Sequence, residues 1–244
     1  MIKIKITVVH HRSQHTPLAI LNQSPLGIIG FYLQGIADVK SLFIQDVCLD
    51  SILDSDLVVI MGAMESIYDP AVCWIKHEQR LIEQVLRRHL PLMGICFGAQ
   101  HIAKVLGGVV QKMPSPVVKL SSIELNEQGE NHAIFHGFQK QFKAVSLHQD
   151  HIILPRSARC LAMSHDILQA FSYESAVGVQ FHPEITPVLL EALIQKRIKQ
   201  SVGYETMTPD CIFLKQAALE YETNLLQQGK LLANNMISLV GEKV

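Results

Sequence analysis

The sequence is poor in charged residues and carries almost no net charge, and each shortage excludes a class of protein. Only 18% of the 244 residues are charged while 48% are hydrophobic, so the chain has too many apolar residues to remain disordered. The formal net charge of −1 lacks the positive excess typical of proteins that bind nucleic acid or anionic membranes. We therefore expect a folded globular chain with neither nucleic acid nor membrane among its partners.

Cysteine motifs and long apolar runs are lacking as well. The five cysteines are scattered, odd in number and form no C-x-x-C motif, which argues against a disulfide framework or a structural zinc site. The longest stretch without a charged residue, 13–37, contains Gln, Asn and Pro and does not predict a bilayer-spanning helix. The apolar run at 6–9 is too short for the core of a signal peptide. These patterns favour a reduced, cytoplasmic location, and we expect no metal and no cofactor.

Apolar runs of strand length alternate with helical patterns through the first 106 residues. The helix expected at 74–88 has a single apolar stripe, as in a helix that packs on a sheet. Short connections between such units argue for a parallel sheet covered on both faces. We expect strands at 4–9, 40–44, 57–61 and 91–95, and helices at 25–35, 74–88 and 97–106.

After Gly108 the pattern changes to short strand-like runs separated by polar loops. This predicts an antiparallel or mixed extension of the sheet, and two helical segments follow, at 187–200 and at about 212–239. The whole is an α/β fold of the flavodoxin-like type, with a main domain at 1–205 and a C-terminal helical appendage at 206–244. The expected strands are 117–125, 142–147, 160–163, 168–171 and 177–181.

The most informative stretch is P-L-M-G-I-C-F-G-A-Q at 91–100, where a buried strand is expected to turn directly into a helix. Gly94 and Gly98 flank Cys96 as in the G-x-S-x-G turn of α/β-hydrolases. The backbone crowds itself at such a turn, so the neighbours must lack side chains. The helix start directs its N–H groups and positive dipole end at the sulfur, which favours thiolate. We predict that Cys96 is a nucleophile and that the N–H of Phe97 stabilises the oxyanion.

A lone cysteine is more often a small buried hydrophobic residue than a nucleophile, and we interpret the other four cysteines, which lack flanking glycines, as structural. A cysteine nucleophile also needs a base that a third group orients. A short apolar strand ends at His182, within V-G-V-Q-F-H-P-E at 177–184. Residues two apart in an extended chain project to the same side, so Glu184 can orient the imidazole of His182.

The other histidines fit this role less well. His10 and His11 follow the first strand without a nearby orienting acid, and His101 is interpreted as a packing or surface residue. The segment H-Q-D-H at 148–151 resembles part of an H-x-H-x-D-H metal pattern, but Ser146 stands where its first histidine is needed. No metal site is therefore predicted there.

Together these residues resemble the class I (triad-type) glutamine amidotransferase family. Residues 94–100 are similar to its G-x-C-x-G-x-Q elbow, and Q-F-H-P-E at 180–184 resembles its motif of the same letters. M-G-A-M-E-S at 61–66, at the end of a predicted strand, resembles its G-G-P-x-S loop. Order and spacing agree over about residues 5–200, and the likeness is to stand-alone members akin to the glutaminase half of GMP synthase.

The resemblance implies roles for the matching residues. Cys96 would attack the side-chain amide of glutamine, forming a γ-glutamyl thioester and releasing ammonia. His182, oriented by Glu184, would protonate the ammonia and then activate water. The resemblance also places an oxyanion hole at the N–H groups of Phe97, Gly62 and Ala63, and substrate contacts at Gln100 and at a loop containing His148, Gln149 and Asp150.

The sequence departs from the family pattern at three positions. Ala63 and Met64 stand where the oxyanion loop has its second glycine and its proline, and Gln149 stands where a glycine is common. An alanine donates the same N–H if its φ is negative, whereas a positive φ would strain it. In the family this glycine belongs to the substrate loop. Its replacement by Gln149 therefore bears on glutamine specificity rather than on thiol chemistry.

Three functions remain open from the sequence. The first is an amidotransferase-type hydrolase of glutamine that supplies ammonia to an acceptor protein in trans, because neither a G-x-x-x-x-G-K-[ST] nor a G-x-G-x-x-G motif is present to activate an acceptor. The second is a γ-glutamyl peptidase using the same triad on a peptide or conjugate. The third is a non-catalytic binding or regulatory protein that retains the fold.

Overall fold

A nine-stranded mixed sheet organises the part of the chain that the structure, a computed structural model, describes: residues 3–11, 27–200 and 208–241. Its strand order is β2-β1-β3-β4-β9-β8-β7-β5-β6. The first five strands in this order pair in parallel and the remaining neighbours pair antiparallel. The sheet therefore has a parallel half and an antiparallel half that meet at β9, as the change of pattern after Gly108 predicts.

The parallel half is built from short strands, and all of them except the edge strand β2 are largely apolar and buried. These strands are β1 (Ile4–His10), β2 (Ala37–Phe43), β3 (Leu57–Ile60), β4 (Leu92–Ile95) and β9 (Ala176–Val179). Every residue of β3, β4 and β9 is buried. Continuous apolar runs of this kind are typical of strands in the middle of a parallel sheet.

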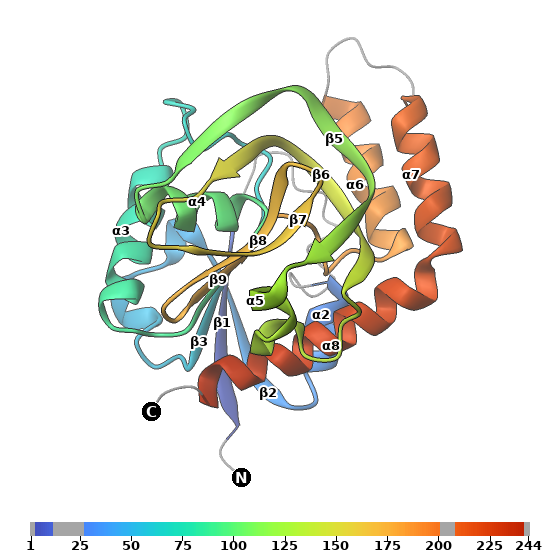
Figure 1. The fold of residues 1–244 in the computed structure, drawn as a ribbon. Helices are drawn as coiled ribbons and strands as arrows, with labels where there is room; N and C mark the ends of the chain where they lie inside the picture. Colours follow the sequence, from blue (N-terminus) through green and yellow to red (C-terminus); the bar gives the residue numbers. More distant parts are fainter. Residues whose placement is uncertain (1–2, 12–26, 201–207, 242–244) are drawn as a thin grey trace.

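The antiparallel half consists of β5 (Val109–Leu125), β6 (Gln141–Ile153), β7 (Arg159–Ser164) and β8 (Ile167–Tyr173). Figure 1 shows β5 and β6 as long curved strands that arch over the sheet. Beyond the end of β9, an isolated bridge joins His182 to Val145 of β6. This bridge places β6 beside His182, at the carboxyl end of the parallel strands.

Helices cover the sheet in three hydrophobic clusters. On one face, α2 (Gly27–Leu33) and α8 (Glu222–Gly241) pack with β1 and β3, while α3 (Ile75–Arg87) and α4 (Phe97–Val105) cover the other face. A third cluster joins α6 (Pro187–Gln200) and α7 (Pro209–Glu220) to β6. The remaining helical turns are α5 (Glu127–Glu130) and the 3₁₀ turns Ile44–Asp46, Leu49–Ser51 and Ala133–Phe135.

The α/β fold class is confirmed, with two corrections to its elements. The helix expected at 212–239 is two helices, α7 and α8, which separate at Tyr221. Leu225, at the start of α8, still packs with α7, but the other apolar buried residues of α8 pack in the cluster with α2, so the chain turns between the two helices. The strands expected at 117–125 and 142–147 are longer, because β5 and β6 pair through a register shift between Lys112 and Val117. The start of the helix expected at 25–35 lies outside the described residues, and the division at residue 205 stays a prediction.

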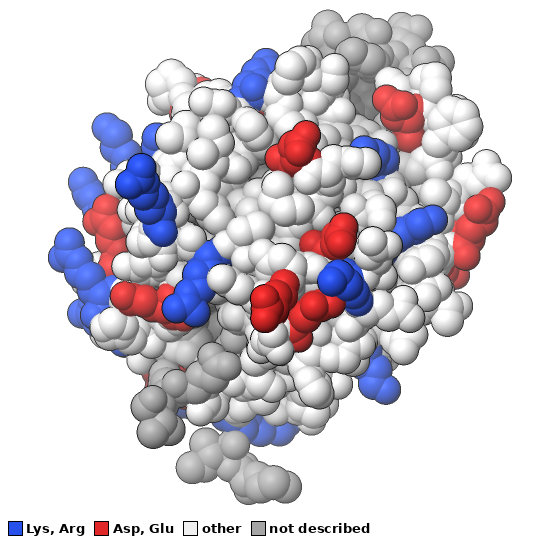
Figure 2. All heavy atoms as spheres, viewed as in Figure 1, with Lys and Arg blue, Asp and Glu red and all other residues white. Residues whose placement is uncertain are grey.

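The surface carries charges of both signs. Figure 2 shows acidic and basic side chains interspersed over one face of the molecule, with basic ones more frequent along the edge where α3 lies. Among the described residues no helix has the length and apolar character needed to cross a membrane.

Candidate active site

Cys96 occupies a sharp turn between β4 and α4. Its backbone has φ 52° and ψ −106°, and it is the residue from which α4 begins. A positive φ is unfavourable for a residue with a side chain, and such conformations persist where the surroundings hold them in place. The cysteine is thus fixed at the N-terminal end of a helix, as the sequence predicts.

The two flanking glycines are required by crowding. A Cβ atom on Gly94 would lie 2.6 Å from the backbone nitrogen of Ala99, and one on Gly98 would lie 2.2 Å from the carbonyl oxygen of Ile60. Both distances are far below van der Waals contact, and the obstructing atoms are backbone. The prediction that this turn excludes side chains at both positions is confirmed.

His182 and Glu184 come to Cys96 from the end of β9. The Nδ1 atom of His182 lies 2.8 Å from the Glu184 carboxylate, and its backbone N–H donates to Val145 of β6. Burial lowers the pKa of His182, but the Glu184 carboxylate and the Cys96 sulfur outweigh burial and raise the pKa well above its ordinary value. The imidazole is therefore held in its protonated form beside the sulfur.

Gly62, two residues after the end of β3, lies next to both Cys96 and His182. A Cβ atom there would lie 3.4 Å from His182 Cε1 and 3.5 Å from the Cβ of Cys96. Ala63 follows and lines the cavity in front of the sulfur, and it is not among the described non-glycine residues with positive φ. The strain that a positive φ would impose on Ala63 is therefore absent.

A cavity of about 190 Å³ opens directly in front of Cys96. Its floor is Cys96 and Gln100, and its walls come from the segment after β3 and from β6. The lining residues are Ala63, Met64, Glu65, Ser66, Cys96, Gln100, Leu147, His148, Gln149 and Asp150. All the substrate contacts expected from the sequence lie in this lining.

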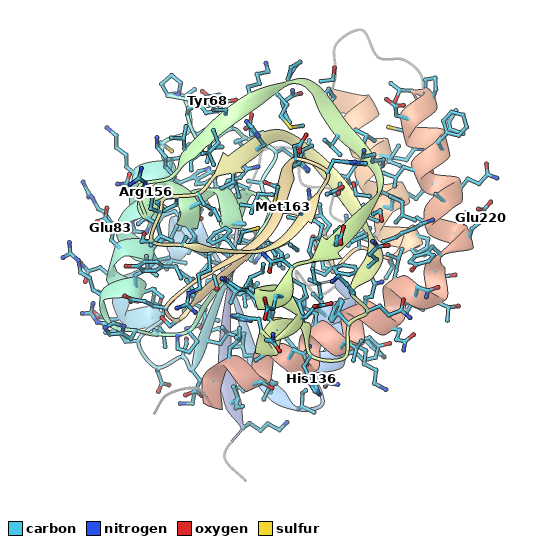
Figure 3. The ribbon with its side chains drawn as sticks, in the orientation of Figure 1. Tyr68, Glu83, His136, Arg156, Met163 and Glu220 are labelled. Atoms are coloured by element: carbon cyan, nitrogen blue, oxygen red, sulfur yellow. The ribbon has the colours of Figure 1, made fainter. Side chains whose placement is uncertain are left out.

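Asp150 ties the two walls of the cavity together. Its carboxylate accepts hydrogen bonds from Ser66 Oγ at 3.1 Å and from Tyr68 Oη at 2.6 Å. Tyr68, labelled in Figure 3, comes from the connection between β3 and α3 and was not identified from the sequence. The segment at 147–150 is part of β6 rather than the loop expected, because it pairs with β5.

The polar groups around the sulfur form a connected set. Gln180, the first residue of Q-F-H-P-E, places its amide nitrogen 3.6 Å from the Cys96 sulfur. Its amide oxygen accepts from Gln100, which also donates to the carbonyl of Asp150. Gln180 is thus a supporting residue that the sequence reasoning missed, although the motif contains it.

His148 and Gln149 differ in what they offer to the cavity. The ring nitrogen Nδ1 of His148 lies 2.9 Å from the carbonyl oxygen of Asp150, and burial lowers the pKa of His148 to about 4. A neutral ring that donates from Nδ1 leaves Nε2 as an acceptor, and this atom has no partner among the described residues. The side-chain amide of Gln149 instead donates to the carbonyl of Met113.

Two interpretations of the histidines, those of His11 and His101, are corrected by the structure. His11 does have an acid beside it, because its Nε2 lies 2.5 Å from the carboxylate of Glu78 on α3. His101 of α4 lies 2.6 Å from the other oxygen of Glu78, so it is a buried partner of that acid rather than a simple packing or surface residue. The described residues, this cluster included, contain no group of His, Cys, Asp and Glu arranged to hold a metal ion.

Comparisons with known proteins agree with this arrangement. Residues 38–199 match the family model for "Glutamine amidotransferase class-I". The chain is 28% identical over 186 residues to one subunit of the glutamine-hydrolysing GMP synthase of Sulfurisphaera tokodaii, covering 75% of this chain and 90% of that one. It is 39% identical over 100 residues to the protein of the same name from Saccharolobus solfataricus, covering 39% of this chain and 52% of that one.

Solved structures show the same fold. A glutamine amidotransferase from Thermotoga maritima aligns with a TM-score of 0.81 and 23% identity, covering 97% of this chain and 99% of that one. A second, from Methylobacillus flagellatus, has a TM-score of 0.78 and 16% identity, covering 96% and 94% of the two chains.

Proposed function

The chain belongs to the class I glutamine amidotransferase family and is an enzyme of that class, and from this premise we propose that it hydrolyses the side-chain amide of glutamine through a thioester on Cys96. The observation that carries the proposal is the meeting of Cys96, His182 and Glu184, with Cys96 in the lining of a cavity. Cys96 follows β4 and the other two follow β9, and together they form a nucleophile, a base and a group that orients the base.

The first step is attack on the amide carbon. The Cys96 sulfur forms a bond to that carbon, and the amide oxygen becomes an oxyanion. The N–H of Phe97, in the first turn of α4, has no partner within the helix and is available to this oxyanion. The N–H of Ala63 supplies the second donor from the facing wall of the cavity.

The second half of the reaction returns the enzyme to its starting state. Protonated His182 gives its proton to the amide nitrogen, the carbon–nitrogen bond breaks, and ammonia leaves a γ-glutamyl thioester. Neutral His182 then takes a proton from water, which attacks the thioester carbon. The carbon–sulfur bond breaks, glutamate leaves with its acid proton passing to ammonia, and the Cys96 thiolate and protonated His182 are restored. Glu184 holds the ring in the required orientation throughout, through its contact with Nδ1.

The amino-acid end of the substrate is assigned to the far wall of the cavity. The carboxylate of Asp150 and the Nε2 acceptor of His148, which has no partner among the described residues, are hydrogen-bond acceptors suited to an ammonium group. The names of the relatives describe one subunit of a larger enzyme, and we propose that the ammonia of this chain likewise serves an acceptor activated on a separate polypeptide.

Ammonia release from glutamine, measured on the purified chain, tests the proposal. Wild type and Cys48→Ala, which removes an exposed thiol, should both release ammonia, whereas Cys96→Ala should lose about 10³-fold or more in kcat. A panel of γ-glutamyl peptides is assayed in parallel. Cleavage of these peptides without glutamine hydrolysis would make the protein a γ-glutamyl peptidase, and activity of Cys96→Ala within about tenfold of wild type would remove Cys96 from the mechanism.

A further inference from the structure

A buried cluster of His11, Glu78 and His101 lies behind the candidate oxyanion hole and takes no part in the steps above. Glu78, on α3, is fully buried, and each of its carboxylate oxygens accepts from one histidine: Oε2 from His11 and Oε1 from His101. His11 follows β1, and His101 is in α4. One carboxylate thus joins three separate elements beneath the active site.

The contacts of His11 fix its protonation. Its Nε2 faces the Glu78 carboxylate and its Nδ1 lies 3.3 Å from the carbonyl oxygen of Gly62. Both neighbours are acceptors only, so both ring nitrogens must carry a proton to satisfy them. Burial lowers the pKa of His11, but Glu78, with smaller contributions from the Gly62 carbonyl and Glu65, raises it above its ordinary value. Burial raises the pKa of Glu78, yet the two histidines lower it to about 2.

The hydrogen bond from His11 to the Gly62 carbonyl also orients the N–H of Ala63, which belongs to the same peptide group. The described residues contain no cis peptide bond, so the carbonyl of Gly62 and the N–H of Ala63 point in opposite directions from one rigid plane. Ala63 lines the cavity in front of Cys96, whereas His11 lies behind it. Holding the carbonyl toward His11 therefore turns the Ala63 N–H toward the cavity.

The same cluster supports the second donor. The ring of Phe97 packs edge-on against His11, with ring centroids 5.3 Å apart, and against His101 at 5.7 Å. Trp74 completes the packing, 4.4 Å from the His11 ring and 5.3 Å from the Phe97 ring. Phe97 is the residue whose N–H faces the oxyanion from the helix side, so both halves of the oxyanion hole are anchored to one group of side chains.

We propose that His11, Glu78 and His101 are positioning residues that set the two oxyanion-hole N–H groups, those of Ala63 and Phe97, through the hydrogen bond from His11 to Gly62 and the packing on Phe97. The expected effect on catalysis rests on the proposed function, whereas the orientation of the Ala63 N–H by His11 does not. Glu78 acts through His11 and touches neither substrate nor sulfur.

Glu78→Gln is the first test, because it keeps the size of the side chain and removes the charge that holds His11 protonated. The charged and titratable groups near His11 are Glu78 from α3, Glu65 from the segment after β3, and His101 from α4 through Glu78. Without the Glu78 charge, the pKa of His11 falls and the ring loses a proton as pH rises. We expect kcat on glutamine to fall roughly 10²-fold, with KM little changed and the loss larger at higher pH.

Alkylation of Cys96 by iodoacetamide separates this role from general damage. Alkylation needs the sulfur but forms no oxyanion, so its rate should be the same in Glu78→Gln as in wild type. Glu83→Gln, on the same helix but partly exposed and directed outward in Figure 3, is the matched control and should change neither rate. Equal losses of kcat and of alkylation rate in Glu78→Gln would overturn the proposal.

Two substitutions of His11 separate the effect of its hydrogen bond to Gly62 from the effect of its ring packing on Phe97. His11→Gln keeps N–H donors but loses the ring, whereas His11→Phe keeps the ring and loses both donors. If the hydrogen bond to Gly62 matters, His11→Gln retains more activity than His11→Phe. The reverse order would mean that ring packing alone is needed, and the proposed positioning of Ala63 would be wrong.

A readout without turnover keeps this test distinct from that of the proposed function. In ¹⁵N-labelled protein, the amide signal of Ala63 should shift in Glu78→Gln and remain in place in Glu83→Gln. An unchanged Ala63 signal overturns the positioning role whatever the activity. A wild-type protein that releases no ammonia would instead refute the proposed function and leave the Ala63 measurement to judge the geometry.

Discussion

At the residue scale, the contact between His182 and Glu184 sets how the site responds to pH. The Glu184 carboxylate helps to raise the pKa of His182 against the effect of burial, so removing its charge lowers that pKa. Departure of ammonia needs the protonated ring, so activity must fall as pH rises through the pKa of His182. In Glu184→Gln we expect the alkaline limb of the kcat profile to move to lower pH, with kcat reduced about 10²-fold.

The chain offers a matched control for this experiment at its surface. His89 and Glu174 form a similar contact at 3.4 Å, but both side chains are exposed. Glu174→Gln should therefore leave the profile of kcat against pH unchanged. An alkaline limb that stays in place in Glu184→Gln would show that another group supplies the proton.

The reactivity of the cysteines is a second prediction at this scale. Cys96 is only 5% exposed, whereas Cys48 and Cys73 are exposed. Accessibility alone would favour the exposed thiols, but a glutamine-like chloroketone enters the cavity in front of Cys96. Peptide mapping after limited labelling should find Cys96 modified first, and equal labelling at Cys73 would argue against an activated Cys96.

The sequence could predict those site residues whose partners lie close to them along the chain. Cys96 with its glycines, and His182 with Glu184, lie within short motifs, so local spacing was sufficient to find them. Glu78 is 67 residues from His11 and 23 from His101, and Tyr68 is 82 residues from Asp150. Such pairs form only when separate helices, strands and loops meet in the folded protein, and no local pattern signals them.

At the element scale, the turn from β4 to α4 depends on contact between backbones. A Cβ atom on Gly98 would meet the carbonyl of Ile60 at 2.2 Å, whereas one on Gly35 would meet nothing within 4 Å. Gly98→Ala should destabilise the protein by about 3 kcal/mol or more, because neither strand nor helix can move away without repacking. Thermal unfolding measures the effect, and Gly35→Ala, with free space around the site, should unfold near the wild-type temperature. Equal unfolding temperatures would show that this contact is not tight.

The C-terminal helix α8 packs on the main body through apolar side chains, and one buried polar side chain adds hydrogen bonds to this contact. The amide nitrogen of Asn235 donates to the carbonyls of Ile134 and His136, at 2.9 and 2.8 Å, and His136 lies close to α8 in Figure 3. Asn235→Ala leaves these carbonyls without their donor and should cost about 1–3 kcal/mol of stability. The exposed neighbour Asn234→Ala should cost little. Denaturant unfolding compares the two, and equal midpoints would contradict this anchoring role.

The elements that the sequence predicted least well are those shaped by tertiary contacts. Apolar spacing continues through Tyr221, so a single helix was expected where the chain turns and most of α8 packs in a different cluster from α7. The strand expected at 117–125 left out the preceding residues, which include Pro114 and Pro116, two residues without an N–H to pair. In the folded protein β5 passes through this region, and a register shift against β6 accommodates it.

At the scale of the whole molecule, the chain has a complete set of candidate catalytic groups, and its ammonia would escape to solvent if turnover ran without control. We expect weak glutaminase activity in the isolated chain and higher activity when an acceptor-activating protein docks and the segment at 62–66 settles around the oxyanion. One oxyanion donor is worth roughly 10²–10³-fold in kcat, enough to account for such a rise. Steady-state kinetics with and without the partner measure it. A kcat of about 1–10³ s⁻¹ on a γ-glutamyl peptide with no partner present would contradict this expectation.

The central claim is that glutamine passes through a thioester on Cys96, and its most direct test is mass spectrometry of protein quenched in acid during turnover. The account predicts a γ-glutamyl group on the peptide that contains Cys96, absent without glutamine and absent from Cys96→Ala. It should be found on neither Cys48 nor Cys73, although both are exposed. Ammonia released from glutamine at full rate by Cys96→Ala, or a γ-glutamyl group on another residue, would contradict the account.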